Sequence, residues 1–247
     1  MSLKGKRKFI VLLIIFSLSG CSSLGPTIRP NPANPIRTVA VLPMYNLTNN
    51  LDGAEYVRER FTEELSNRQY VVMDTAEVTS ILQEQTGITL GSQLEMTSPE
   101  VIGEILGVDA LVYGYLLDFD DIILGVYNAR VVRAAFKAVN VRSGKLMWSN
   151  AKGFKFVIFS GDLGLLATIA KELVDSGESF ETVKGLEDIS GLNDWTTVPV
   201  PVESIENAAI LTLGALVIGK AFGVHLHHES NVMIEELTRN IPAGPGN

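Results

Sequence analysis

The chain contains a single cysteine, Cys21, and this limits how the fold can be stabilised. A disulfide within the chain needs two cysteines, so none can form. Cysteine nucleophiles and thiolate metal sites would likewise have to use Cys21 itself. The fold must therefore depend on an apolar core, and hydrophobic residues make up 46% of the sequence.

The residues before Cys21 are typical of an export signal. Four basic residues within positions 4–8 precede an uncharged apolar run over 9–18. That run is about half the ~20 residues that a membrane-spanning helix needs. We therefore interpret residues 1–20 as a signal peptide.

The run ends in Leu18-Ser19-Gly20-Cys21, which resembles a bacterial lipobox. In proteins with that pattern the cysteine thiol receives a diacylglyceryl group, cleavage occurs before the cysteine, and the freed amine is acylated. The resemblance implies a covalent lipid on Cys21, and we expect no other cofactor. The alternative is an ordinary signal peptide that happens to contain a cysteine. Ser22, rather than an aspartate, follows Cys21, and by resemblance to sorted lipoproteins this favours the outer membrane.

Removal of residues 1–20 would make an acidic chain more acidic. That segment holds four of the twenty basic residues and no acidic one, so the formal charge would change from −8 to −12. Such a domain is a poor candidate for binding nucleic acid or anionic lipid headgroups. We therefore expect contact with the membrane through acyl chains, and no nucleic-acid partner.

Three parts are expected after the signal peptide. Residues 21–36 include four prolines and predict a lipid anchor followed by a semi-rigid tether. Residues 37–160 alternate short apolar runs with helical patterns, which predicts an α/β domain. Residues 161–247 predict a helical C-terminal region. Its expected segments are helices over about 162–177 and 204–223, an extended stretch at 198–202, and an amphipathic stretch at 232–237.

Local signals place the helices of the α/β domain. We expect a helix over about 53–67 capped by Asp52, with Arg58 among the residues facing solvent. Asp74 is expected to begin a second helix. Ser98, which precedes a proline, is expected to begin a third helix that ends at Gly107. Apolar runs at 38–43, 70–73 and 110–117 predict the intervening strands.

Residues 126–141 and 145–158 predict a long antiparallel hairpin that turns at Ser143-Gly144. Alternation puts Val132, Ala134, Phe136 and Ala138 on one face and Arg133 and Lys137 on the other. The expected fold class is α/β (α+β). It combines a mixed sheet containing this hairpin, helices packed on the sheet, and a helical C-terminal extension.

Four segments, in their order along the chain, resemble a known group of domains. They are Val39-Ala-Val-Leu-Pro43 with Asn46, Val108-Asp-Ala-Leu-Val-Tyr-Gly114, residues 134–139, and Asn140-Val-Arg-Ser-Gly-Lys-Leu-Met-Trp148. The order is similar to the α/β periplasmic domain of the curli secretion lipoprotein CsgG, the TolB amino-terminal domain and the uncharacterised GNA-type lipoproteins.

This resemblance covers roughly residues 37–160. The group's hairpin typically reads Val-Asp-x-x-Thr-Gly-Glu-Leu/Val-x-Trp, and here Asn140, Ser143 and Lys145 replace the Asp, Thr and Glu. The resemblance implies an outer-membrane lipoprotein with an assembly or interaction role, and it implies no enzymatic activity.

All three histidines lie close together, at His225, His227 and His228, and Glu229 follows them. Imidazoles with a carboxylate could bind zinc or copper. We favour the alternative, a polar exit from an apolar helix. The same histidines are the only candidates for a catalytic imidazole base, and none lies in a Gly-x-Ser-x-Gly context.

Two further segments have alternative interpretations. Asp118, Asp120 and Asp121 follow a predicted strand and could bind a cation or act as acid and base, although a solvated loop is the favoured interpretation. Residues 208–219 form the most apolar stretch after Cys21, bracketed by Glu206 and Lys220. These twelve residues are too few to span a bilayer. A core helix is favoured over a subunit interface or a membrane-surface helix.

The leading hypothesis is a non-enzymatic lipoprotein of the outer membrane that faces the periplasm. It would bind envelope proteins, including other copies of itself, in envelope assembly or secretion. One alternative is an oligomeric secretion channel of the curli type, for which the hairpin at 126–158 is the candidate spanning segment. Its Arg133 and Lys137 would be disfavoured in lipid. A second alternative is a metal-binding or hydrolytic protein.

Overall fold

The computed structural model describes residues 28–124, 127–160, 183–202, 205–221 and 224–246. The expected signal peptide, Cys21 and the helix expected over 162–177 lie outside these residues. In chain order the elements are β1 (Thr38–Val41), β2 (Tyr45–Asn46), α2 (Leu51–Asn67), β3 (Val71–Val72), α3 (Thr75–Thr86), the 3₁₀ helix η1 (Gly91–Met96), α4 (Pro99–Leu106), β4 (Ala110–Ile123), β5 (Tyr127–Asn140), β6 (Leu146–Ser160), β7 (Trp195–Val202), α6 (Ile205–Ala221) and α7 (His227–Thr238).

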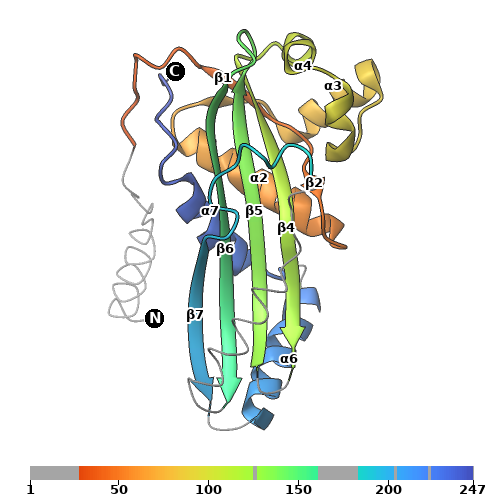
Figure 1. Ribbon diagram of the computed structural model, residues 1–247, viewed down its shortest axis with the longest axis vertical. Coiled ribbons are helices and arrows are strands. Elements are labelled where there is room, and N and C mark those ends of the chain that lie inside the picture. The colour runs from red at the N-terminus through yellow and green to blue at the C-terminus, as the bar shows by residue number, and fades with distance from the viewer. Residues whose placement is uncertain (1–27, 125–126, 161–182, 203–204, 222–223, 247) are drawn as a thin grey trace, which may run out of the picture.

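One mixed sheet runs the length of the described structure in the order β3-β1-β4-β5-β6-β7, with β2 paired to β4 (Figure 1). Strands β4, β5 and β6 form an antiparallel meander of 14, 14 and 15 residues. Strand β1 pairs in parallel with β4, and β7 pairs in parallel with β6. The predicted fold class, a mixed sheet with a long antiparallel hairpin and packed helices, is confirmed.

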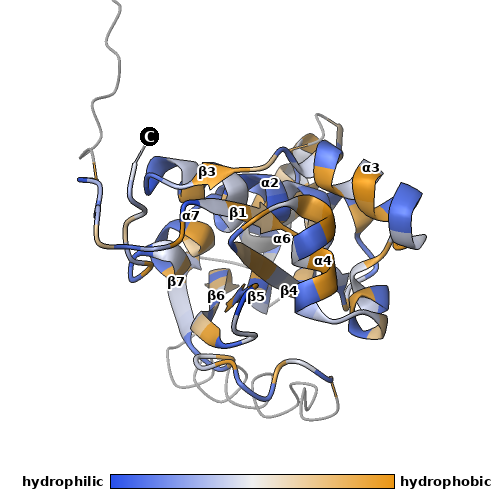
Figure 2. Cartoon of the chain, turned by 90° about the horizontal axis from the view of Figure 1, so that it is seen from above, coloured by the Kyte–Doolittle hydropathy of each residue, from blue (hydrophilic) through white to orange (hydrophobic). Residues whose placement is uncertain are grey.

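Both faces of the sheet are apolar, and different elements cover them. Because side chains alternate along a strand, Val39 and Val41 of β1 face the core under α2 and α7, whereas Ala40 and Leu42 face α3 and α4. Seen from above, α2 and α7 lie on one side of β4–β6 (Figure 2). We call this side the α2 face and the opposite side the α4 face.

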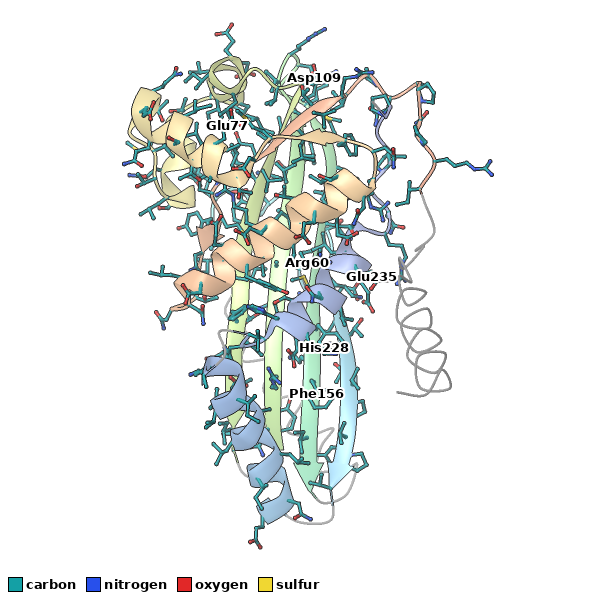
Figure 3. The ribbon with its side chains drawn as sticks, turned by 180° about the vertical axis from the view of Figure 1, so that it is seen from behind. Arg60, Glu77, Asp109, Phe156, His228 and Glu235 are labelled. Atoms are coloured by element: carbon teal, nitrogen blue, oxygen red, sulfur yellow. The ribbon has the colours of Figure 1, made fainter. Side chains whose placement is uncertain are left out.

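Two later segments complete the cover. On the α4 face, Leu186 and Ile189 pack against Tyr115, Ala135 and Ala151. On the α2 face, α6 follows α2 and α7 towards the end of the sheet where β4 stops and β5 starts, which we call the distal end (Figure 3). Among the described helices, none is long and apolar enough to cross a membrane.

The C-terminal part of the chain completes the same sheet and the same core. The stretch expected to be extended at 198–202 lies in β7, which pairs with β6. Met233, Ile234 and Leu237 of α7 are fully buried against the α2-face core. The region predicted to be a helical extension therefore also contributes a strand and part of the main core.

Most of the predicted caps are confirmed. The Asp74 carboxylate accepts hydrogen bonds from the backbone N–H groups of the first turn of α3, and Ser98 caps α4. Gly107 ends α4 in the left-handed conformation. Asp52 was the wrong cap for α2, because the helix begins earlier and the Asn50 side chain accepts from the Gly53 amide at 2.7 Å.

Arg58, expected to face solvent, is 2% exposed. Its guanidinium donates to the carbonyl of Val41 at 2.9 and 3.1 Å and to the carbonyl of Thr75 at 3.1 Å. Burial lowers the pKa of Arg58, and the nearby Glu55 opposes that shift. The side chain thus joins α2 to the end of β1 and the start of α3. The solvent-facing prediction was wrong because helical periodicity does not show which elements later surround a helix.

Truncation of Arg58 should therefore destabilise the fold. Arg58→Ala would leave two buried carbonyls without their donor and a cavity behind, and should cost about 3 kcal/mol of unfolding free energy. Arg60→Ala on the same helix is the matched control, because Arg60 is partly exposed and its ion pairs should contribute less than about 1 kcal/mol. Urea denaturation of the unlipidated chain from Ser22 onward measures both. Equal losses for the two variants would contradict the structural role of Arg58.

Candidate functional site

The structure brings together three of the predicted site residues, Asp121 of β4, His225 before α7 and Glu229 of α7. The imidazole Nε2 of His225 contacts the Asp121 carboxylate. Arg130 of β5 lies beside both acids, with its Nε 3.7 Å from Asp121 Oδ1 and 3.2 Å from Glu229 Oε1. We call these four residues the charge cluster, and they fix the segment before α7 to the sheet.

The remaining two histidines point elsewhere. The ring of His227 stacks on Tyr56 with centroids 3.5 Å apart, and His228 is exposed. Burial lowers the pKa of His227, and His225 lowers it further. In the part of the chain that the structure describes, no group of three or more His, Cys, Asp or Glu side chains could hold a metal ion. Of the four predicted ligands, only His225 and Glu229 thus lie in the charge cluster, whereas His227 stacks on Tyr56 and His228 is exposed.

Asp118, Asp120 and Asp121 lie in a strand and not in the predicted solvated loop. Strand β4 continues beyond a bulge at 116–118 and includes all three of them. Asp118 accepts from Arg133 Nε at 2.5 Å, Asp121 belongs to the charge cluster, and Asp120 is exposed. The loop prediction was wrong because two arginines of the paired strand neutralise carboxylates that would otherwise oppose burial.

The charge cluster contains a His–Asp pair, but its geometry does not favour catalysis. An imidazole acting as a base needs its second nitrogen within hydrogen-bond reach of a substrate or a nucleophile. Nδ1 of His225 is buried and has no hydrogen-bond partner among the described residues. The cluster therefore fits a structural role.

An open cleft of about 540 Å³ lies on the α4 face. Tyr113 and Tyr115 of β4 and Lys137 of β5 form its floor, because alternate residues of the paired strands point to this side. One wall is η1, and the opposite wall is the segment 184–188. Alternation along the hairpin predicted Lys137 on this side of the sheet, but the two tyrosines were not predicted. Tyr113 and Tyr115 are two residues apart in a strand, so their side chains lie on the same face, and this spacing is the signal that could have identified them.

The floor of the cleft combines one ammonium group with two phenol rings. The ammonium of Lys137 donates to the Gly185 carbonyl at 2.7 Å and lies about 6 Å from the ring centroids of both tyrosines. Burial lowers the pKa of Lys137. Burial also raises the pKa of Tyr113 to about 12 and shifts that of Tyr115 upward. Both phenols therefore stay protonated at neutral pH and can donate hydrogen bonds.

The two walls are held close to the floor. Glu95 of η1 and Lys184 form an ion pair of 3.4 Å between the walls. Gly185 has φ +92°, and a Cβ there would lie 2.2 Å from the Tyr115 hydroxyl. A Cβ at Gly91, in the other wall, would lie 2.2 Å from the backbone of Met44. Glycine is required at both positions for this width of cleft.

A smaller, apolar cavity of about 250 Å³ lies on the α2 face, between residues 31–36 and the C-terminal tail. Trp148 is half-buried at its edge, and its ring centroid lies 6.1 Å from that of Phe61. Asn34 closes one side by donating to the Ala243 carbonyl. The segment after the expected lipid anchor is thus fixed to the end of the chain.

Loss of the arginine from the charge cluster should destabilise the fold. Arg130→Met would leave two buried carboxylates facing each other, and breaking a buried pair in this way costs about 3–5 kcal/mol. Arg130→Met combined with Glu229→Met should recover part of that loss. Arg142→Met, at an exposed turn, is the control. Urea denaturation of these three variants and of Glu229→Met alone forms the test, and additive losses in the double variant would contradict coupling.

Several solved structures are similar to parts of the chain. Lipoprotein GNA1162 from Neisseria meningitidis aligns over 56% of this chain and 96% of its own, with a TM-score of 0.46 and 23% identity. The C-terminal domain of LpoB from Salmonella enterica aligns over 50% and 86%, with a TM-score of 0.35 and 16% identity. PelC from Paraburkholderia phytofirmans, solved as a dodecamer, aligns over 49% and 71%, with a TM-score of 0.32 and 15% identity.

Sequence comparison identifies the family. A protein of Neisseria meningitidis serogroup B named "Putative lipoprotein NMB1124/NMB1162" is 23% identical over 150 residues, which cover 61% of this chain and 69% of that protein. The family model described as "Putative lipoprotein GNA1162-like" matches residues 31–176, more than half of the chain. The resemblance to CsgG and TolB stays a prediction, whereas the resemblance to the GNA-type lipoproteins is confirmed. The chain therefore belongs to the GNA1162-like lipoprotein family.

Proposed function

We propose that this protein is a lipid-anchored, non-enzymatic component of the cell envelope that binds a polypeptide partner in the α4-face cleft. The observation that carries the proposal is the cleft floor, where two neutral phenols surround one ammonium group. The family supports a lipoprotein, and the lipobox-like sequence ending at Cys21 supports acylation of that cysteine. Ser22 favours the outer membrane, with the folded part facing the periplasm.

The chemistry of the cleft suits a polypeptide. Aromatic rings provide apolar contact at low entropic cost, and their hydroxyls can donate to the carbonyl groups of a bound chain. The rim holds Glu95, Asp188 and Lys184, so charges of both signs meet a ligand there. A strongly anionic ligand such as a nucleotide would be opposed by these acids and by the negative charge of the whole chain.

The alternative of a secretion channel has less support, because the long hairpin is engaged on both faces. On the α2 face, Phe136 stacks on Phe61 with centroids 3.9 Å apart. On the α4 face, Arg133 donates to the Leu192 carbonyl at 3.0 Å. Exposure of either row to lipid would break these contacts. The metal-binding or hydrolytic alternative would need a site other than the charge cluster.

Replacement of the cysteine tests the anchor. Cys21→Ser should remove the acyl groups and release the protein from the membrane fraction, whereas Ser23→Ala should leave it anchored. Ser22→Asp should move the protein from the outer to the inner membrane. Membrane fractionation with intact-mass measurement provides the readout. A Cys21→Ser protein that still carries acyl mass would contradict the proposed anchor.

Site-specific crosslinking tests the cleft. A photoreactive phenylalanine analogue at Met96, which lies at the cleft and is 83% exposed, should crosslink to a polypeptide in living cells. The same analogue at Leu51, 79% exposed on α2, is the matched control and should not. Tyr113→Phe removes one hydroxyl without loss of volume and should lower the yield at Met96 about 2–10-fold. Equal yields at Met96 and Leu51 would contradict a binding role for the cleft.

A further inference from the structure

Helix α6 has one side against the sheet and an apolar side facing out. It contacts β4, β5, β6 and β7 near the distal end. Yet five aliphatic side chains of the helix are each about half exposed or more, up to 65% at Val217, and apolar surface of this kind commonly marks an interaction site. The five are Ile210, Leu211, Leu213, Val217 and Ile218. The core-helix interpretation thus explains only the inward side of α6.

The outward side has the spacing of a coiled-coil seam. Glu206, Ile210, Leu213, Val217 and Lys220 recur at intervals of four, three, four and three residues, and all five are exposed. In heptad terms, Ile210 and Val217 occupy a positions and Leu213 occupies the d position between them. Apolar residues at a and d positions form a seam that can pack against a second helix.

The charges at the ends of this seam are complementary to each other. Glu206 lies seven residues before Leu213, and Lys220 lies seven residues after it. If two such helices run antiparallel and cross at Leu213, the Glu206 of each copy meets the Lys220 of the other copy. One such pair then lies at each end of the seam. A parallel pair would instead place like charges together. Gly214 lies next to the crossing point, and a Cβ there would meet no atom of the described residues within 4 Å.

We propose that the outward face of α6 binds the α6 of a second copy of this chain, antiparallel and centred at Leu213. Such a contact is isologous, so one two-fold axis closes the dimer. The helix dipoles are then opposed, which adds to the favourable charge pairing. A lipid surface fits this face less well, because helices that lie on membranes are rich in Lys and Arg, and Lys220 is the only basic residue of α6.

The seam is short, and this sets the expected strength. Three apolar positions per helix bury less than the ~800 Å² per partner of a standard interface. Pairing should therefore be weak in dilute solution and depend on concentration. Engineered disulfides suit a contact of this kind, because they trap it in the living cell with the full-length chain.

Single cysteines test both the contact and its direction. The chain has only Cys21, so each substitution adds one new thiol, and the unsubstituted chain controls for Cys21. Leu213→Cys should form a disulfide-linked dimer in oxidised cells. Glu206→Cys alone should not, because its two copies would lie about 20 Å apart along the seam. Glu206→Cys coexpressed with Lys220→Cys should form a mixed disulfide. Glu235→Cys, exposed on α7, is the control for random collision.

Charge reversal gives a second readout at positions where folding is not at risk. Glu206→Lys or Lys220→Glu, each combined with Leu213→Cys, should lower the dimer yield about two- to fivefold, since each reversal affects two ion pairs. The double reversal should restore the yield. A dimer through Glu206→Cys alone would overturn the antiparallel arrangement.

Other occupants would also overturn the proposal. A disulfide from Leu213→Cys to a different envelope protein would assign the face to that partner. Protection of this cysteine from a membrane-impermeant thiol reagent, without any disulfide, would assign it to lipid. Free reactivity without any disulfide would show that the face is unoccupied.

Discussion

The constraint on which the rest of the structure depends is the length of the β4–β5–β6 meander. Its strands have 14–15 residues, and both of their faces carry apolar side chains. At ~3.4 Å per residue such strands extend almost 50 Å, about twice the length of a 17-residue helix. No single helix can cover either face. The α2 face needs α2, α7 and α6, and the α4 face needs α3, α4 and the segment that contains Leu186.

The two surfaces that we connect with function arise where this cover is incomplete. On the α4 face, the Glu95–Lys184 ion pair links η1 to the segment 184–188, and the space between these walls leaves Tyr113 and Lys137 partly exposed as the floor of a cleft. At the distal end, α6 is a single layer over the sheet, with no further element of the described structure covering Ile210 and Val217. One surface is a cleft that combines aromatic and charged side chains, and the other is the aliphatic outward side of a helix, so they fit different partners.

Buried ions join the separate pieces of this cover. Arg58 connects α2 to β1 and α3, and Arg130 connects the sheet to the start of α7. Burial of charge is costly unless partners compensate it. These contacts therefore contribute little net free energy to folding. Their main effect is that arrangements of the helices that break them are unstable. The charge cluster also fixes His225, four residues after the end of α6, to strand β4.

The sequence by itself determined the features that depend on neighbours within a few residues. Caps at Asp74, Ser98 and Gly107, the long hairpin and the fold class followed from local hydrogen bonding and from alternation of apolar residues. The tyrosine cleft, the burial of Arg58 and the pairing of Asp121 with His225 were decided only by the tertiary structure. Asp121 and His225 are 104 positions apart, and their contact depends on strand register and helix placement that no local pattern encodes. Burial of a charged side chain is set by whatever surrounds it, and that surrounding exists only once distant segments have packed.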